Sequence, residues 1–321
     1  MRPASGCKLF GAYQALGGIQ DGVVLLHSVV GCNFGSMSLH VAQDMRDIRQ
    51  TCTVISDSDV VFSGEASLER AVRSALELFQ PSVLFVVSGC VSEMIGDDIP
   101  AVLARIPHEA PLLHVEAAGF RGDAARGLEA GWLALLPLMK PPVPRPYPRP
   151  YPRSDPRPLV NLIGLGMDDP HAADDVEALR AMLAPQAALG AVLSRCTLEE
   201  VRRAPYADVN LVLRGKGREL AQAMKEYFGI PWEELDYPYG AAGADDLWSR
   251  LERRFGLDYH QARAELDRQI AEGAGKAYRY LQPISNTASQ GTPRHPFSSQ
   301  RNSRQREITM FSESKSALIS K

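Results

Sequence analysis

The sequence predicts an α/β protein with two Rossmann-like parallel-sheet domains and a disordered C-terminal tail. Short apolar runs of strand length alternate with amphipathic helical patterns, and a proline-rich segment divides this alternation into two series. The length of 321 residues also suits about two domains of roughly 150 residues each. Because parallel strands need crossover helices, which then cover the faces of the sheet, the alternation indicates parallel sheets.

The first domain is predicted over residues 1–136. A helical stretch at 9–16 comes first, and a second helix is expected over 68–79, where apolar residues recur every three to four positions after a candidate N-cap at Ser67. β-rich apolar runs that are typical of strands lie at residues 22–28, 53–55, 83–88 and 112–115.

A linker is predicted over residues 137–158, which contain ten prolines. Proline fixes φ and lacks an N–H, so this segment should be an extended spacer; a PxxP ligand for a recognition domain is the alternative. The second domain is expected over 159–281. Its strands are predicted at 159–165, 187–193 and 209–213, and its helices at 172–183, 198–203, 219–228, 245–255 and 259–281.

Residues 282–321 are rich in Ser, Arg, Gln and Asn and show no sustained apolar period, which predicts a disordered tail. The tail is either natural or the product of a frame change or truncated reading, and the sequence leaves both open.

Composition excludes several classes of protein. With 35 Lys and Arg against 38 Asp and Glu, the net charge of −3 argues against a highly basic nucleic-acid-binding protein. The longest apolar runs stop far short of the roughly 20 residues that span a bilayer, and residues 1–6 lack the apolar core of a secretory signal. We therefore expect a cytoplasmic protein. Five cysteines argue against a disulfide scaffold and leave metal-binding, catalytic or buried thiols.

Three cysteines share a similar local context. Cys7 precedes a predicted helix, while Cys32 and Cys90 each follow a predicted strand and directly succeed a glycine. Because the carboxyl ends of parallel strands lie along one edge of the sheet, Cys32 and Cys90 should share that edge. A helix N-terminus favours the thiolate, the form that binds metals. Buried structural thiols are the alternative, and zinc fits less well because no CxxC pair occurs. Three thiolates completed by another subunit suit an iron–sulfur cluster.

At these residues the chain resembles nitrogenase component 1 and its relatives. The spacings Cys7 to Cys32 and Cys32 to Cys90 match those of cluster-binding cysteines in the β subunit of the nitrogenase molybdenum–iron protein. The resemblance covers about residues 5 to 281. Other matching segments are Leu16-Gly17-Gly18, His27 to Cys32, Val61-Phe62-Ser63-Gly64, Gly89 to Ile99, Val160 to Leu165, Phe228-Gly229-Ile230-Pro231 and Pro238-Tyr239-Gly240.

The resemblance implies that Cys7, Cys32 and Cys90 hold a [4Fe-4S] or P-cluster-like [8Fe-7S] cluster. It implies a homologous sister subunit in an α2β2-type oligomer and an ATP-dependent iron-protein reductase, which docks near Phe62; the alternative for Phe62 is a core residue. The leading interpretation is a reductase subunit that relays electrons from this partner to a substrate. The alternatives are a scaffold for metallocluster or cofactor assembly and a truncated non-catalytic relative.

The chain also departs from the resembled family. Its third α/β domain is missing, and Arg214 stands near the position where the catalytic subunit anchors its cofactor through a cysteine. We therefore expect no nitrogenase-type molybdenum cofactor on this chain. Cys52 and Cys196 match no ligand position.

Other polar residues have structural interpretations. Glu93, Asp97 and Asp98 are expected to begin the helix that follows Cys90, where the helix dipole stabilises negative charge, although a carboxylate site is the alternative. His27 is expected to be a buried, hydrogen-bonded histidine rather than a group that tunes the cluster or carries protons. Gly215-Lys216-Gly217 lacks the spacing of a phosphate loop, so no nucleotide is expected on this chain.

Overall fold

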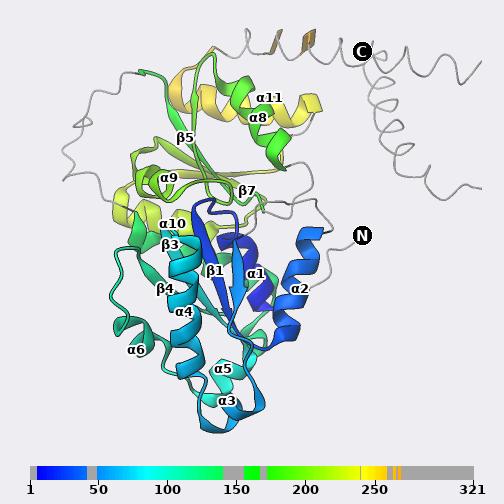
Figure 1. The fold of residues 1–321 in the computed structure, drawn as a ribbon. Coiled ribbons are helices and arrows are strands. Elements are labelled where there is room, and N and C mark those ends of the chain that lie inside the picture. The colour runs from blue at the N-terminus through cyan, green and yellow to red at the C-terminus, as the bar shows by residue number, and fades with distance from the viewer. Residues whose placement is uncertain are drawn as a thin grey trace, which may run out of the picture. The chain divides into compact units, whose positions relative to one another are not determined.

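Two four-stranded parallel sheets form the framework of the protein, which confirms the predicted α/β class (Figure 1). The structure is a computed structural model that describes residues 6–41, 49–139, 155–166, 172–238, 240–258, 263–264 and 267–268. Both sheets belong to one unit that ends at Asp258.

The first sheet has the strand order β2-β1-β3-β4. Its strands are Gln50–Cys52 (β2), Gly22–His27 (β1), Val83–Ser88 (β3) and Leu112–Glu116 (β4). Every residue of β1 and β3 is buried, because helices cover both faces of these central strands. On one face Val24, Leu26 and Phe85 pack with residues of α1 and α7; on the other Leu25 and Leu84 pack with residues of α4 and α6.

Helix α1 precedes the first strand, and the other helices of the first half lie after β1. The helices of this half are α1 (Lys8–Leu16), α2 (Val30–Val41), α3 (Asp57–Phe62), α4 (Glu65–Phe79), α5 (Cys90–Ile95), α6 (Ile99–Ala104) and α7 (Ala124–Leu133), with 3-10 turns at Gly119–Arg121 (η1) and Leu136–Leu138 (η2). In α4 the buried residues Leu68, Val72 and Leu76 lie on the face that the sequence predicts.

The second sheet has the order β6-β5-β7-β8. Its strands are Ala188–Val192 (β6), Leu159–Ile163 (β5), Val209–Leu213 (β7) and Trp232–Leu235 (β8), and its helices are α8 (Ala172–Leu183), α9 (Leu198–Arg203), the 3-10 turn Ala204–Tyr206 (η3), α10 (Arg218–Phe228) and α11 (Gly240–Phe255). A buried amide pair joins its central strands, since Asn161 Nδ2 donates to Asn210 Oδ1 at 2.9 Å.

Several local predictions differ from the structure; the helix predicted at 245–255, for example, begins at Gly240. The strand predicted at 53–55 lies at Gln50–Cys52 instead, since Val54 has a φ of 54° and interrupts the extended backbone. Strand β8 was not predicted. Its sequence Trp-Glu-Glu-Leu is not an apolar run, in keeping with the half-buried position of most of the strand. Ser67 is not an N-cap: α4 begins at Glu65, and the Ser67 hydroxyl donates to Asp59 instead.

Most of the predicted linker and all of the predicted tail lie outside the described residues. Most of the helix predicted at 259–281 lies outside them as well. Within the part of the chain that the structure covers, no helix combines the length and apolar character needed to cross a bilayer.

A carboxylate connects α7 of the first half to α10 of the second. Glu129 accepts hydrogen bonds from the backbone N–H groups of Gly217, Arg218 and Glu219, at 2.6, 3.1 and 3.2 Å. These are N–H groups at the start of α10 that have no partner within the helix. Glu129 therefore acts as an N-cap supplied from a distant helix, and it holds the loop at Gly217 against α7.

Replacing Glu129 by Ala is expected to lower the free energy of unfolding by about 1–2 kcal/mol, which is the upper part of the range of about 0.5–2 kcal/mol measured for loss of an N-cap. Urea unfolding followed by circular dichroism measures this change. Glu226→Ala, an exposed position on α10, is the matched control and should cost no more than about 0.5 kcal/mol. Equal losses in the two variants would show that Glu129 does not act as a cap.

Candidate metal centre

The carboxyl edge of the first sheet brings two of the predicted cysteines to neighbouring elements. Strands β1 and β3 pair in register, with His27 opposite Ser88. Helices α2 and α5 begin just beyond these residues, so Cys32 lies in the first turn of α2 and Cys90 is the first residue of α5. The N–H of Gly89 donates to the carbonyl of His27 at 3.0 Å, which ties the two strand ends together.

Cys7 reaches the same region from the start of α1, where it is the N-cap residue. Both Cys7 and Cys90 lie against Gly119, in the turn η1 that follows β4. A Cβ atom at Gly119 would lie 3.3 Å from Cys90 Sγ and 3.5 Å from Cys7 Sγ, so the two sulfur atoms are no further apart than the sum of these distances. The structure thus brings Cys7 and Cys90 together.

Cys32 is half-buried and lies near Cys52. Burial raises the pKa of the Cys52 thiol, and its proximity to Cys32 adds to this shift. Among the described residues, no group of three or more His, Cys, Asp or Glu side chains is arranged closely enough to hold a metal ion. Cys7, Cys32 and Cys90 therefore line one edge of the sheet without forming a closed metal site.

The three cysteines supply the type of ligand that an iron–sulfur cluster requires. All three thiols are half-buried, and thiolates are the ligands that iron–sulfur clusters require. Ser28 Oγ is buried between β1 and Gly89 and, among the residues that the structure covers, has no hydrogen-bond partner. Gly31, which precedes Cys32, is exposed, and no atom would lie within 4 Å of a Cβ at that position.

The hydrogen bond to Cys90 was not anticipated from the sequence. The backbone N–H of Gly119 donates to Cys90 Sγ at 3.1 Å. The run Ala117-Ala118-Gly119 after a strand was the available signal, because small residues allow close approach of the backbone.

Cys52 and Cys196 differ from the three candidate ligands. Cys52 Sγ accepts from the N–H of Val54 at 3.3 Å and donates to the carbonyl of Ser28 at 3.5 Å. Cys196 is completely buried, and burial raises the pKa of its thiol strongly. Cys196 is therefore a core thiol.

Apolar side chains are exposed around this edge. Phe62, at the end of α3, is 83% exposed, so its alternative interpretation as a core residue is wrong. Helix α2 exposes Val30, Phe34 and Met37, which recur at i, i+4 and i+7 and therefore share one face. Met94, on α5, is exposed as well. An apolar surface of this kind is typical of a protein interface.

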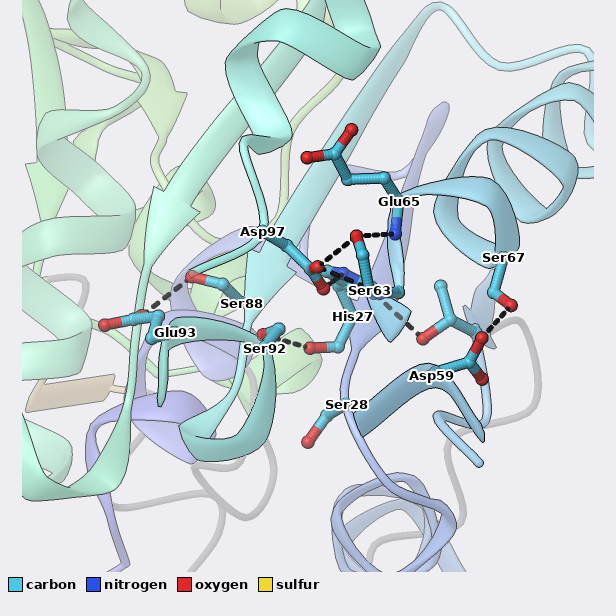
Figure 2. A network of polar contacts seen from close by, with 12 residues as sticks. His27, Ser28, Asp59, Ser63, Glu65, Ser67, Ser88, Ser92, Glu93 and Asp97 are labelled. Carbon is cyan, nitrogen blue, oxygen red and sulfur yellow. Dashed lines mark hydrogen bonds and ion pairs between the residues drawn. The ribbon is translucent and has the colours of Figure 1, made fainter. Parts of the chain in front are cut away.

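A buried hydrogen bond joins His27 to Asp97 next to the turn that follows Phe62. His27 Nε2 lies 2.9 Å from Asp97 Oδ2, and neither side chain is more than 1% exposed (Figure 2). The other Asp97 oxygen accepts hydrogen bonds from Ser63 Oγ and the Gly64 N–H, each at 2.9 Å. The expectation of a buried, hydrogen-bonded histidine is confirmed, and Asp97 anchors the turn between α3 and α4.

The predicted position of two acidic residues is wrong. Helix α5 ends at Ile95, so Asp97 and Asp98 follow it rather than begin it. Asp98 is the N-cap of α6 and accepts from the N–H of Ala101 at 3.0 Å. Glu93 does lie in the first turn of α5, as expected.

The pKa of His27 makes stability depend on pH. Burial lowers this pKa, and the hydrogen bond to Asp97 opposes the shift. As the pH falls, His27 is therefore protonated at a higher pH in the unfolded chain than in the folded protein. Its contribution to stability is fully present above about pH 6.5 and decreases as the pH drops below that value. One such group changes the free energy of unfolding by at most about 1.4 kcal/mol per pH unit.

We expect the decrease in melting temperature between about pH 7.5 and about pH 5.5 to be smaller in His27→Gln than in the wild type. Differential scanning calorimetry at both pH values measures it. His108→Gln removes an exposed histidine and should keep the wild-type pH dependence. A His27→Gln variant with an unchanged pH dependence would contradict this assignment.

Arg214 follows the end of β7. Its backbone has a positive φ of 49°, and its guanidinium lies 5.8 Å from the centre of the Tyr237 ring. Gly217, three residues after Arg214, donates its N–H to Glu129.

Comparison with known proteins places this architecture in a family. The model of the nitrogenase component 1 type oxidoreductases matches residues 7–288. The chain is 28% identical over 260 residues to the nitrogenase iron-molybdenum cofactor biosynthesis protein NifE of Rippkaea orientalis, covering 78% of this chain and 53% of the relative. It is 29% identical over 279 residues to NifE of Methanosarcina barkeri, covering 81% and 57%.

The fold matches as well. The solved structure of nitrogenase Cp1 at pH 6.5 superposes with a TM-score of 0.71 at 21% identity, over 87% of this chain and 55% of that one. This chain thus spans about half the length of the relatives that it matches. Because the family model covers most of the sequence, the chain belongs to the nitrogenase component 1 type oxidoreductases.

Proposed function

We propose that this chain is a subunit of a scaffold on which a metallocluster or cofactor is assembled. The observation that carries the proposal is its similarity to cofactor biosynthesis proteins over about four-fifths of its length. This was the alternative interpretation of the sequence, and the relatives favour it over electron relay to a substrate.

Cys7, Cys32 and Cys90 are the residues that would hold an iron–sulfur cluster in this scaffold. The contact of Cys7 and Cys90 with Gly119, and the position of Cys32 at the carboxyl edge of the same sheet, support this assignment. When bound, such a cluster supplies electron transfer. The protein's own contribution is to keep the thiols half-buried and to donate the Gly119 N–H to Cys90 Sγ at 3.1 Å.

A homologous sister subunit is the partner we propose for the exposed face of α2. Three cysteines leave a [4Fe-4S] cluster one ligand short, and a ligand from across an interface completes it. The exposed side chains Val30, Phe34 and Met37 lie on the same helix as Cys32 and support an interface there. An α2β2-type assembly follows from the resemblance, as does docking of an iron-protein reductase at Phe62.

Anaerobic co-expression with the sister subunit tests the function. The purified complex should contain iron and sulfide and should pass a preformed cluster or cofactor once, stoichiometrically, to a recipient protein that lacks it. Sustained multiple-turnover reduction of a substrate with an iron protein and ATP would support the reductase interpretation instead. A complex that contains no iron would contradict both and favour a non-catalytic relative.

The reductase remains the second candidate because of one specific observation. Phe62 and Val61 are 83% and 73% exposed at the end of α3, as a docking surface for an electron donor requires. This surface is also compatible with a scaffold that receives electrons during assembly. Binding of an iron protein therefore does not distinguish the reductase from the scaffold, whereas multiple-turnover reduction of a substrate does.

A further inference from the structure

We infer that Glu93 is a positioning residue that holds the amide of Gly119 against the sulfur of Cys90. The inference deepens the proposed function, since it rests on Cys90 as a cluster ligand. Glu93 does not touch the sulfur itself. It acts through the loop between β4 and α7, to which it is bonded at several points.

The carboxylate of Glu93 is almost completely buried, with 6% of its side chain exposed. Its Oε1 atom accepts hydrogen bonds from Ser88 Oγ at 2.7 Å and from the N–H groups of Ala117 and Ala118 at 2.8 and 2.9 Å. Its Oε2 atom pairs with Arg121 Nε at 2.7 Å. Figure 2 shows the bond between Ser88 and Glu93 at the start of α5.

These contacts bracket Gly119 on both sides. Ala117 and Ala118 precede it and donate hydrogen bonds to the carboxylate, while Arg121 follows it and forms an ion pair with the same carboxylate. Alanine and glycine have no polar side chain with which to fix the loop. Besides its backbone hydrogen bonds, such as that from the Arg121 N–H to the Ala118 carbonyl at 2.9 Å, the loop is held by Glu93, and the Gly119 N–H lies 3.1 Å from Cys90 Sγ.

Glu93 and Cys90 lie on the same short helix, one turn apart. Any displacement of α5 therefore moves the sulfur and the carboxylate together, and the loop follows through its bonds to Glu93. This coupling preserves the N–H to sulfur distance. A buried carboxylate is costly to desolvate, so the three hydrogen bonds to Oε1 and the ion pair of Oε2 with Arg121 indicate a specific positional role.

The N–H to sulfur hydrogen bond has a chemical consequence for a bound cluster. A donor to a ligating sulfur stabilises the more negative, reduced state and so raises the reduction potential. Loss of Glu93 should free the loop, weaken this bond and make the potential more negative. A purely structural role for Glu93 predicts lower stability without a change in potential.

The test compares Glu93→Ala and Glu93→Gln with Glu116→Ala in the full chain, co-purified anaerobically with its sister subunit. Glu116 also pairs with Arg121, at 2.8 Å, but is 56% exposed and does not bond the loop amides, so it is the matched control. Two quantities are measured: amide hydrogen exchange in the segment that contains Gly119, and the midpoint potential of the cluster by anaerobic titration.

In Glu93→Ala, exchange at Gly119 should be roughly five- to tenfold faster than in the wild type, as expected for one lost hydrogen bond, and the potential should be more negative. Glu93→Gln keeps one acceptor oxygen, so its exchange rate and midpoint potential should lie between those of Glu93→Ala and the wild type. Glu116→Ala should change neither quantity. If Glu93→Ala does not fold, Glu93→Gln must still show both changes.

Unchanged exchange in the Glu93 variants would overturn the inference. Faster exchange with an unchanged potential would overturn it too, since the amide would not act on the cluster. A wild-type complex without iron would refute the proposed cluster, whereas the exchange data would still decide whether Glu93 positions Gly119.

Discussion

Replacing Cys7, Cys32 or Cys90 by Ala is expected to remove most of the iron, the sulfide and the visible absorbance of the anaerobically purified complex. Each substitution removes one of the three proposed thiolate ligands, and a [4Fe-4S] cluster left with two ligands from this chain would be lost or degraded. Iron and sulfide analysis, together with electron paramagnetic resonance of the reduced protein, measures the effect.

Two other cysteines provide matched controls for this series. Cys52→Ala and Cys196→Ala should retain the cluster, because Cys52 is bonded within its own strand region and Cys196 is buried in the core. Cys52 is the sharper control, since it lies near Cys32. Equal loss of iron from all five variants would indicate general misfolding and would contradict the assignment of the ligands.

The elements that the sequence predicted well are those whose environment is uniform. Strands β3 and β7 have the predicted bounds, because a central parallel strand is buried on both faces and its sequence is a continuous apolar run. Strand β8 has no such signal, since it pairs only with β7 and carries two glutamates. Edge strands of this kind depend on tertiary pairing rather than on local pattern.

The candidate site was predictable in part for a similar reason. Cys90 follows a buried strand, and the topology rule for parallel sheets then fixes the edge on which it lies. The contacts of Glu93 with Ala117 and Ala118 could not be predicted, because they join residues 24 and 25 positions apart through the geometry of the folded loop. The hydrogen bond between His27 and Asp97, which are 70 positions apart, could not be predicted for the same reason.

The packing of α1 on α7 positions Cys7 and depends on two glycines. A Cβ atom at Gly127 would overlap the carbonyl oxygen of Lys8 and lie 2.7 Å from the nitrogen of Ala12. A Cβ atom at Gly11 would likewise overlap the carbonyl of Ala124. The two helix backbones are therefore in direct contact, and no flexible side chain is present that could move aside.

Gly127→Ala is expected to lower the free energy of unfolding by roughly 3 kcal/mol or more, since overpacking against backbone atoms forces the two helices apart. Alanine favours the helix over glycine by about 1 kcal/mol, so helix propensity alone would make the variant more stable. A decrease in stability therefore reports the clash between the two helices. Because α1 begins next to Cys7, the variant should also retain less iron. Chemical denaturation and iron analysis measure the two effects.

Gly31→Ala is the matched control, because Gly31 is also helical but no atom would lie within 4 Å of its Cβ. Its unfolding free energy should stay the same or rise by up to about 1 kcal/mol, as helix propensity dictates. If Gly127→Ala behaved like Gly31→Ala, α1 and α7 could not be in backbone contact. The position of Cys7 beside Gly119 would then need another explanation, since α1 is the element that carries this cysteine to the edge of the sheet.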